Sequence, residues 1–267
     1  MSVSSISRRD TLRQMLACTL PLLAASASHA QVVDSSDAVN KAGRLRMLSQ
    51  RMVKAWLALG QQVEPIRADK VLVESMDLFD RQRSELKAFA PTPEIRATYQ
   101  RLDTAWSDFR AALVAARPSS AAAPRLLALD AQLLALAQQG TQQLEAYSGK
   151  PQGRLVNIAG RQRMLSQRMA KFQLAQDWKV VADAHEQITQ SRREFLAALD
   201  VLNDAPEASV AIRQELLLAR QQWVFFDNAL TKVGHLSPHE AADVFVTSEN
   251  ILQVMDHITG LFAHITA

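Results

Sequence analysis

NKAGRLRMLSQRMVK, residues 40–54, recurs 117 residues later as NIAGRQRMLSQRMAK, residues 157–171. Twelve of the fifteen positions are identical. Most of the remaining sequence differs between the two halves, so both copies meet a local requirement beyond that of helix formation. The repeat therefore indicates an internal duplication, and it is the first place to look for function.

The sequence around the first copy favours helices throughout. Ala, Leu, Gln, Arg and Glu are frequent, whereas Gly and aromatic residues are few, which is a helix-forming composition. There is no alternating strand pattern, and Pro and Gly divide the first half into four segments. We expect a helix that begins after an N-cap among residues 34–37 and ends near Leu59, followed by helices over 66–89, 94–116 and 125–147.

The second half repeats this plan at the same spacing. Trp106 maps on Trp223 and Phe109 on Phe226, and breaks near Asp177, residues 203–206 and residues 234–238 separate four further helices. Because short connections force neighbouring helices to run antiparallel, each half should form a four-helix bundle. The sequence predicts an all-α fold of two tandem antiparallel four-helix bundles, with domains at 31–148 and 149–267.

Residues 1–30 have the pattern of an export signal. Arg8 and Arg9 precede an apolar segment, and Ser28-His29-Ala30 is a small-residue cleavage site, which predicts a twin-arginine signal or, alternatively, a Sec signal. Its removal takes away three arginines and one aspartate, so the formal net charge falls from +3 to +1 and gives no reason to expect nucleic-acid binding. No later apolar run approaches the roughly 20 residues that span a bilayer. We expect a periplasmic protein.

The repeated stretch has two distinct faces when it is placed on a helix at about 100° per residue. Leu45, Leu48, Met52, Trp56 and Leu59 form an ordinary core stripe. The opposite face is of mixed character and is identical in the two copies. It consists of Val39, Gly43, Arg46, Gln50, Lys54 and Leu57 in the first copy, and of Val156, Gly160, Arg163, Gln167, Lys171 and Leu174 in the second.

The repeated glycine and arginine together suggest a binding site. A glycine inside a helix costs roughly 1 kcal/mol relative to alanine, and close backbone approach is the usual reason for it. If the two faces pack about a pseudo-twofold axis, Arg46 and Arg163 converge and repel each other. A planar oxyanion between them would remove the repulsion and accept paired guanidinium hydrogen bonds. The predicted anion site comprises Arg46, Arg163, Gly43, Gly160, Gln50 and Gln167, supported by Asn40, Asn157, Arg51, Arg168, Lys54 and Lys171, with Arg44 and Arg161 in the adjoining polar strip.

Other chemistry is weakly indicated. Arg and Lys on helices are mostly solvated surface, and the methionines of the motif are more often core residues than ligands. The histidines are scattered, Cys18 is the only cysteine, and we expect no metal and no cofactor. Because paired carboxylates, a glycine-rich phosphate loop and a nucleophile elbow are all missing from the sequence, we do not expect an enzyme.

Both motif copies resemble the PilJ-like domain, the N-terminal domain of type IV pilus methyl-accepting chemotaxis transducers, and NIAGRQRMLSQR at 157–168 is very close to that family's signature. They are also similar to the P-box of nitrate-sensing histidine kinases such as NarX and NarQ, in which four-helix periplasmic domains dimerise and hold nitrate between their first helices. The resemblance implies that Arg46 and Arg163 bind the ligand beside Gly43 and Gly160, with Arg51 and Arg168 in support. Lys41 matches a basic P-box position, whereas its counterpart Ile158 does not.

We therefore expect an exported, sensor-type protein that binds nitrate or nitrite between the two motif helices. Because no transmembrane, kinase or methyl-accepting segment follows, it would bind without signalling by itself, and its partner would be a membrane-bound sensor kinase or chemoreceptor. A helical envelope scaffold or adaptor, associated with pili or chemotaxis and without a small ligand, is the alternative. The motifs could also pair between two chains in a homodimer rather than within a monomer.

Overall fold

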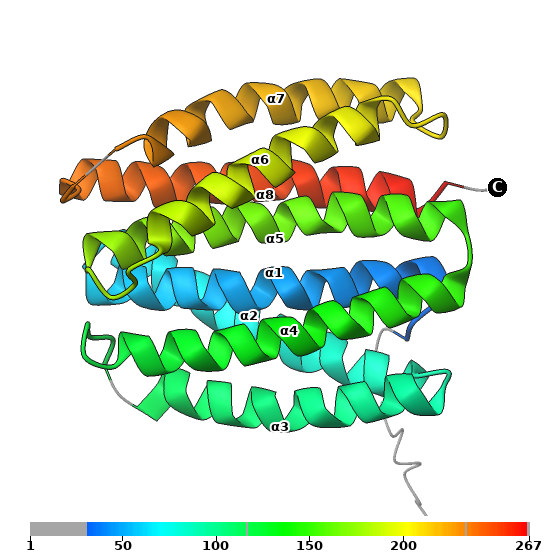
Figure 1. The fold of residues 1–267 in the computed structure, drawn as a ribbon, viewed down its shortest axis with the longest axis horizontal. Coiled ribbons are helices and arrows are strands. Elements are labelled where there is room, and N and C mark those ends of the chain that lie inside the picture. Colours follow the sequence, from blue (N-terminus) through cyan, green and yellow to red (C-terminus); the bar gives the residue numbers. More distant parts are fainter. Residues whose placement is uncertain (1–30, 116, 233, 266–267) are drawn as a thin grey trace, which may run out of the picture. The chain divides into compact units, whose positions relative to one another are not determined.

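Residues 31–115, 117–232 and 234–265, which this computed structural model describes, form eight helices and contain no strand (Figure 1). The predicted all-α fold of two successive four-helix sets is confirmed. The first set is α1 (Ser35–Gly60), α2 (Pro65–Phe89), α3 (Pro93–Ala115) and α4 (Ala123–Ser148), and the second is α5 (Pro151–Asp177), α6 (Ala184–Asn203), α7 (Val210–Leu230) and α8 (Pro238–Ala263).

Local capping interactions explain where several helices begin and end. Asp34, one of the predicted caps, accepts a hydrogen bond from the backbone N–H of Asp37 at 2.8 Å and so starts α1. Ser237 and Glu240 form a capping box at the start of α8. Gly149 ends α4 at φ +61°, in the left-handed region that glycine adopts without strain. The observed bounds lie close to those predicted from the sequence.

Two predictions fall on parts of the chain outside the described residues. These are the export signal at residues 1–30 and the last residue of the predicted third helix, residue 116. Among the residues that are described, no helix combines the length and apolar character needed to cross a membrane.

Helices α1 and α5 lie side by side at the centre of the helical unit, and their mutual contact is more extensive than that of any other helix pair (Figure 1). Helices α2 and α4 pack on α1, and α6 and α8 pack on α5, while α3 and α7 lie outermost against α4 and α8. Residues 32–267 thereby form one compact unit. The division into domains at residues 148 and 149 stays a prediction.

Each repeat contains an equivalent aromatic stacking contact in its outer layer. Trp106 stacks on Phe79 with ring centroids 4.3 Å apart, and Trp223 stacks on Phe195 at 4.7 Å. Both tryptophans are buried, as the matching apolar stripes of the two halves predicted. The tryptophans keep the 117-residue spacing of the motif, whereas Phe79 and Phe195 are 116 residues apart, so the second helix of each repeat is offset by one residue.

The C-terminal end of α1 is packed too tightly for any side chain larger than that of glycine at Gly60. A β-carbon at this position would lie 2.1 Å from the indole ring of Trp178 and 3.0 Å from the β-carbon of Pro118. Trp178 in turn meets the edge of buried Trp56 at a centroid distance of 6.3 Å. We expect Gly60→Ala to lower the free energy of unfolding by about 1–3 kcal/mol through overpacking, measured by urea unfolding.

Gly260 in α8 is the matched control for this substitution. No atom lies within 4 Å of the position that its β-carbon would take. Because alanine favours a helix over glycine, Gly260→Ala should leave stability unchanged or raise it by up to about 1 kcal/mol. Equal stabilities of the two variants would contradict the proposed clash with Trp178.

Candidate functional site

The polar face of each motif copy is buried inside the helical unit. Arg46, Gln50 and Lys54 of α1 are 0% exposed, as are Arg163 and Gln167 of α5. Charged side chains are almost never fully buried unless they are paired or serve a function. The predicted burial of this face between the repeats is therefore observed, and each of its charges needs a counter-ion or another explanation.

The two motif arginines converge beside the two motif glycines. A β-carbon on Gly43 would lie 3.1 Å from Nη2 of Arg46 and 3.5 Å from Nη2 of Arg163. A β-carbon on Gly160 would lie 3.0 Å from Nη2 of Arg163 and 3.8 Å from Nη2 of Arg46. Both guanidinium groups thus occupy the space that the missing side chains leave open, which gives the glycines their structural reason.

Every hydrogen bond that Arg46 donates goes to a neutral acceptor. Its Nη1 donates to Oε1 of Gln138 at 2.7 Å, and its Nη2 donates to Oδ1 of Asn157 at 2.7 Å and to the Asn157 carbonyl at 3.4 Å. The side-chain amide of Asn157 in turn donates a hydrogen bond to the Glu145 carboxylate. Within the described part of the chain, no carboxylate lies within ion-pair distance of Arg46 itself. Its charge is therefore buried without a direct counter-ion.

Unlike Arg46, Arg163 donates to a carboxylate, that of Asp256, and it shares this acceptor with Arg44. Its Nη1 donates to Oδ1 of Asp256 at 2.5 Å, and its Nη2 donates to the Asn40 carbonyl at 3.1 Å. Arg44 donates to the same Asp256 oxygen at 2.9 Å. A single carboxylate thus serves two guanidinium groups, and the seam between the repeats carries an excess of positive charge.

Burial and neighbouring charges shift the pKa values of Arg46, Arg163 and Asp256. Burial, followed by the charges of Arg161 and Arg163, lowers the pKa of Arg46 to about 9, against the opposing effect of Glu145. Burial and Arg44 lower the pKa of Arg163 to about 10, although Asp256 opposes them. Burial alone would raise the pKa of Asp256, but the two arginines outweigh it and lower that pKa to about 2. Both arginines are therefore still charged at neutral pH, at an energetic cost.

Several polar atoms beside the arginines have unused hydrogen-bonding capacity. Over the described ranges, the buried Nε atoms of Arg46 and Arg163 and the buried Oδ1 of Asn40 have no hydrogen-bond partner. Buried donors without acceptors are rare in folded proteins, since each costs about 1–3 kcal/mol. The guanidinium pair is thus short of both negative charge and acceptors.

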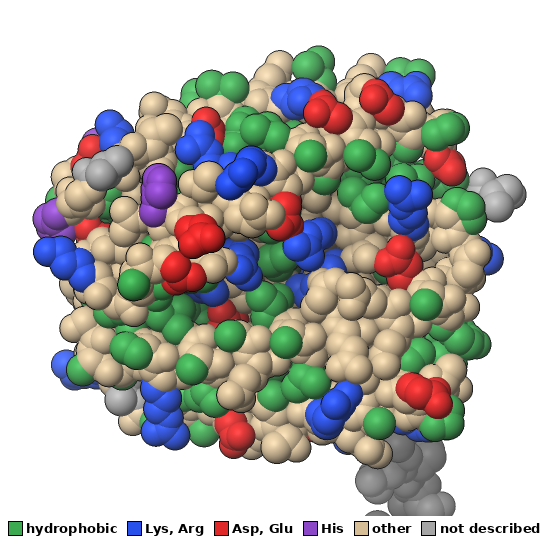
Figure 2. Space-filling view, in the orientation of Figure 1, with side chains coloured by type: hydrophobic (Ala, Val, Ile, Leu, Met, Phe, Trp, Pro, Cys, Tyr) green, Lys and Arg blue, Asp and Glu red, His purple; other side chains and the backbone are tan. Residues whose placement is uncertain are grey.

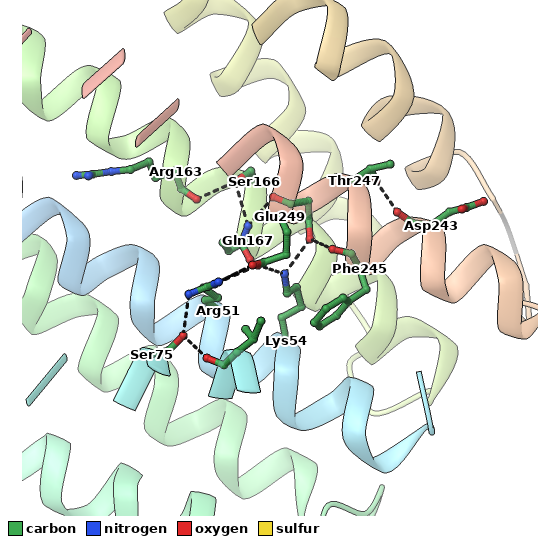
Figure 3. A network of polar contacts seen from close by, with 12 residues as sticks. Arg51, Lys54, Ser75, Arg163, Ser166, Gln167, Asp243, Phe245, Thr247 and Glu249 are labelled. Carbon is green, nitrogen blue, oxygen red and sulfur yellow. Dashed lines mark hydrogen bonds and ion pairs between the residues drawn. The ribbon is translucent and has the colours of Figure 1, made fainter. Parts of the chain in front are cut away.

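The lysine of the first motif reaches into the other repeat (Figure 3). Nζ of Lys54 on α1 donates to Glu249 at 2.6 Å and to Ser248 at 2.9 Å, both on α8. Glu249 also accepts three hydrogen bonds from Arg51, at 3.1 and 3.2 Å from Nε and at 2.5 Å from Nη2. Burial lowers the pKa of Lys54 to about 8, whereas Lys54 and Arg51 outweigh burial at Glu249 and lower its pKa to about 2.

The lysine of the second motif makes the reciprocal contact. Nζ of Lys171 on α5 donates to Asp130 on α4 at 2.7 Å, and the other oxygen of Asp130 accepts from Gln50 at 2.8 Å. Asp130 is 1% exposed and Lys171 is 3% exposed. Each motif lysine is therefore neutralised by the fourth helix of the opposite repeat, and these two crossed ion pairs tie the repeats together.

The structure divides the predicted site residues into two groups. Arg46, Arg163, Gly43 and Gly160 meet at the seam, and Asn40 and Asn157 contact the arginines. The remaining predicted residues lie farther along the helices. They form ion pairs and hydrogen bonds with α2, α4, α6 and α8, and they are Gln50, Gln167, Arg51, Arg168, Lys54 and Lys171.

Sequence reasoning missed the acceptors that α4 and α8 supply. These residues are not part of the repeated motif, so the internal comparison did not select them. Asp130 did carry a signal, because it is a lone carboxylate in the Leu- and Ala-rich run at 126–137. The missed residues are Asp130, Gln138, Glu145, Glu249 and Asp256.

This geometry defines a class of protein, namely an all-helical tandem duplication with a buried glycine and arginine motif on the first helix of each repeat. The chain belongs to the PilJ family, described as "Type IV pili methyl-accepting chemotaxis transducer N-term", which matches residues 28–132 and 148–259. Domains of this family are sensory rather than catalytic and are typically periplasmic. No protein with a curated description and no solved structure matches the chain significantly.

Proposed function

We propose that this protein is an exported sensor domain that binds a small planar oxyanion, nitrate or nitrite, at the seam between α1 and α5. Arg46 and Arg163 would bind the anion, with Gly43 and Gly160 providing the space beside it. Asn40 and Asn157 would orient the two guanidinium groups. The site lies within one chain, so the duplication provides the two arginines that a dimer would otherwise have to combine.

One observation carries this proposal: Arg46 is fully buried, charged, and bonded only to neutral acceptors. Burying an ion without a counter-ion costs several kcal/mol, and a bound monoanion would remove most of that cost. The flat guanidinium suits a flat oxyanion because its paired N–H groups lie in one plane. The unpaired Nε atoms on both arginines are further donors within the same seam.

The anion would take over hydrogen bonds that now close the seam. The Nη2 atoms of Arg46 and Arg163 donate to backbone carbonyls of Asn157 and Asn40, respectively. A neutral carbonyl is a weaker acceptor for a guanidinium than an anionic oxygen, so the exchange would be favourable. Because it would pull both motif helices toward one ion, it would change how α1 and α5 pack, and a membrane-bound chemoreceptor or sensor kinase could detect that change.

Nitrate should raise the thermal stability of the purified protein at fixed ionic strength. By mass action, ligand at about 100 times its dissociation constant adds about 2.7 kcal/mol, which corresponds to roughly 5–10 °C in Tm for a chain of this size. We expect chloride at equal concentration to give a much smaller shift because a single spherical acceptor cannot match the two parallel N–H groups of a guanidinium as a planar oxyanion does. The measurement is a melting series in sodium salts.

Arg46→Lys and Arg163→Lys are the variants that test the site, because each keeps the positive charge and removes the planar donor pair. Either should weaken nitrate binding at least tenfold in calorimetric titrations. Arg213→Gln is the matched control, since Arg213 is exposed on α7 and should bind as wild type does. A nitrate shift that survives both lysine variants would overturn the site. Absence of any shift in the wild type would favour the scaffold function, and a doubled mass in solution would favour pairing between chains.

A further inference from the structure

A groove between α4, α5 and α6 lies outside the arginine seam and has a volume of about 580 Å³. Figure 2 shows Lys and Arg side chains gathered in a hollow between α4 and the α5–α6 pair, with hydrophobic side chains around them. Leu127, Leu134, Met164 and Phe172 form much of its wall, and its charged lining residues are Asp130, Arg161, Arg168 and Lys171. The volume is in the range of small-molecule sites.

The duplication supplies an internal reference for this groove. A second groove of about 440 Å³ lies between α1, α2 and α8, and its wall includes Arg44, Met47 and Arg51. Their counterparts in the repeated motif, Arg161, Met164 and Arg168, line the first groove. The two grooves therefore occupy equivalent places in the two repeats and can be compared residue by residue.

Helix α8 neutralises the two motif arginines of the reference groove, Arg44 and Arg51. Arg51 forms three hydrogen bonds with Glu249, and Arg44 pairs with Asp256 at 2.9 Å. Both carboxylates project from the same wall of that groove. The two motif arginines of this groove are therefore already paired, and the remaining arginine in its wall, Arg67, is solvent-exposed.

Helix α4 has no carboxylate at the equivalent places. Asp130 of α4 and Ser248 of α8 occupy equivalent positions, because each accepts a hydrogen bond from the lysine of the opposite motif. The next residue is Ala131 in α4 and Glu249 in α8. Gln138 accepts from Arg46 as Asp256 accepts from Arg163. An alanine and a neutral amide thus replace the two carboxylates, and the groove is larger in volume and has fewer carboxylates in its wall.

Because of this replacement, the Arg168 guanidinium has no carboxylate in direct contact with it among the described residues. Arg161 pairs with Glu194 at 2.6 Å, but Arg168 donates to the neutral amide of Gln187 and lies over the Phe172 ring at 5.2 Å. Across the described ranges, no carboxylate lies within ion-pair distance of Arg168. The groove therefore combines one available positive charge with an apolar wall.

We propose that this groove binds an organic monocarboxylate, with the carboxylate on Arg168 and its alkyl or aromatic body against Leu127, Leu134, Met164 and Phe172. A single charge fits because Lys171 and Arg161 already have carboxylate partners, so a dianion would find only one free cation. An inorganic anion would leave the apolar wall uncovered. This groove shares Gln138 with the oxyanion seam, where it accepts from Arg46, but the proposed carboxylate contact at Arg168 involves neither seam arginine.

Calorimetric titration with decanoate tests the proposal, using 1-decanol and decyltrimethylammonium as probes of equal chain length below their micelle-forming concentrations. Decanoate should bind, decanol should bind at least tenfold more weakly, and the cation should give no saturable signal. Arg168→Gln should weaken decanoate binding at least tenfold and leave the response to decanol unchanged. Ala131→Glu should have the same effect without removing the arginine, because it restores the carboxylate found in the other groove.

Arg51→Gln is the matched control and should bind decanoate as wild type does, since Glu249 keeps Lys54 as its partner. Circular dichroism verifies that each variant is folded. Equal binding of decanol and decanoate, unchanged binding by folded Arg168→Gln, or no binding of decanoate by the wild type at millimolar concentration would each overturn the proposal. Loss of the nitrate response in Arg46→Lys would leave decanoate binding intact, so the two sites fail independently.

Discussion

Replacing Asp130 with alanine should lower the free energy of unfolding by about 3–5 kcal/mol, the largest effect we expect from a single substitution. Asp130 is 1% exposed and neutralises Lys171, which is 3% exposed. The same carboxylate accepts a hydrogen bond from buried Gln50. Removing it leaves an ammonium group and an amide donor buried without their acceptor. Urea unfolding followed by circular dichroism measures the loss.

A double-mutant cycle separates the buried ion pair from simple loss of packing. Lys171→Met in the Asp130→Ala background removes the stranded charge, and we expect it to restore most of the lost stability because apolar replacements of buried ion pairs are often close to neutral. Asp108→Ala, on the exposed face of α3, is the control and should change stability by less than about 0.5 kcal/mol. If the double variant is no more stable than Asp130→Ala alone, the ion pair does not have the stabilising role described above.

Acidification should destabilise the protein as the pH falls from about 4.5 toward 2, and Glu249 should dominate the effect. Its side chain is 9% exposed, and its pKa is lowered from 4.5 to about 2 because Lys54 and Arg51 outweigh burial. A carboxylate whose pKa is lowered on folding stabilises the native state above its unfolded pKa and loses that contribution as it is protonated. The expected loss is about 3 kcal/mol over this interval, measured as unfolding free energy against pH.

Glu249→Gln should flatten this part of the pH profile, because the group that titrates is gone. The variant should also be less stable at pH 7, since Lys54 and Arg51 lose their shared counter-ion. Glu74→Gln is the control: Glu74 is 55% exposed and meets only Lys70, at 3.8 Å, among the described ion pairs. A Glu249→Gln profile parallel to that of the wild type below pH 4.5 would show that other carboxylates govern acid unfolding.

The fold followed from features that sequence displays directly. Proline and glycine marked the ends of the helices, the Trp106 and Trp223 stripes matched the third helix of one half to the third helix of the other, and the repeated motif identified α1 and α5 as the helices to compare. The convergence of Arg46 and Arg163 was also predictable, because a glycine that recurs beside an arginine implies close approach. These inferences needed only local patterns and the comparison of one half with the other.

The electrostatic partners could not be predicted in the same way. Asp130, Glu249 and Asp256 meet the motif across helices far away in the sequence, and helical periodicity gives the face of a residue but not the side chain that it meets. Gln50 and Lys54 were grouped with Arg46 because they share its face. Each helical turn advances about 5.4 Å, however, which is enough to place them opposite α4 and α8 rather than at the arginine seam.

The crossed lysine contacts have a consequence for how this chain can evolve. Lys54 depends on Glu249 of α8, and Lys171 depends on Asp130 of α4, so deletion of either copy would remove the acceptor of the other copy's lysine and uncover the face that buries it. The two acceptors lie at different positions of their helices, so one copy cannot be replaced by a duplicate of the other without loss of an ion pair. We therefore expect substitutions to be tolerated more readily in the outer helices α3 and α7 than at these two pairs.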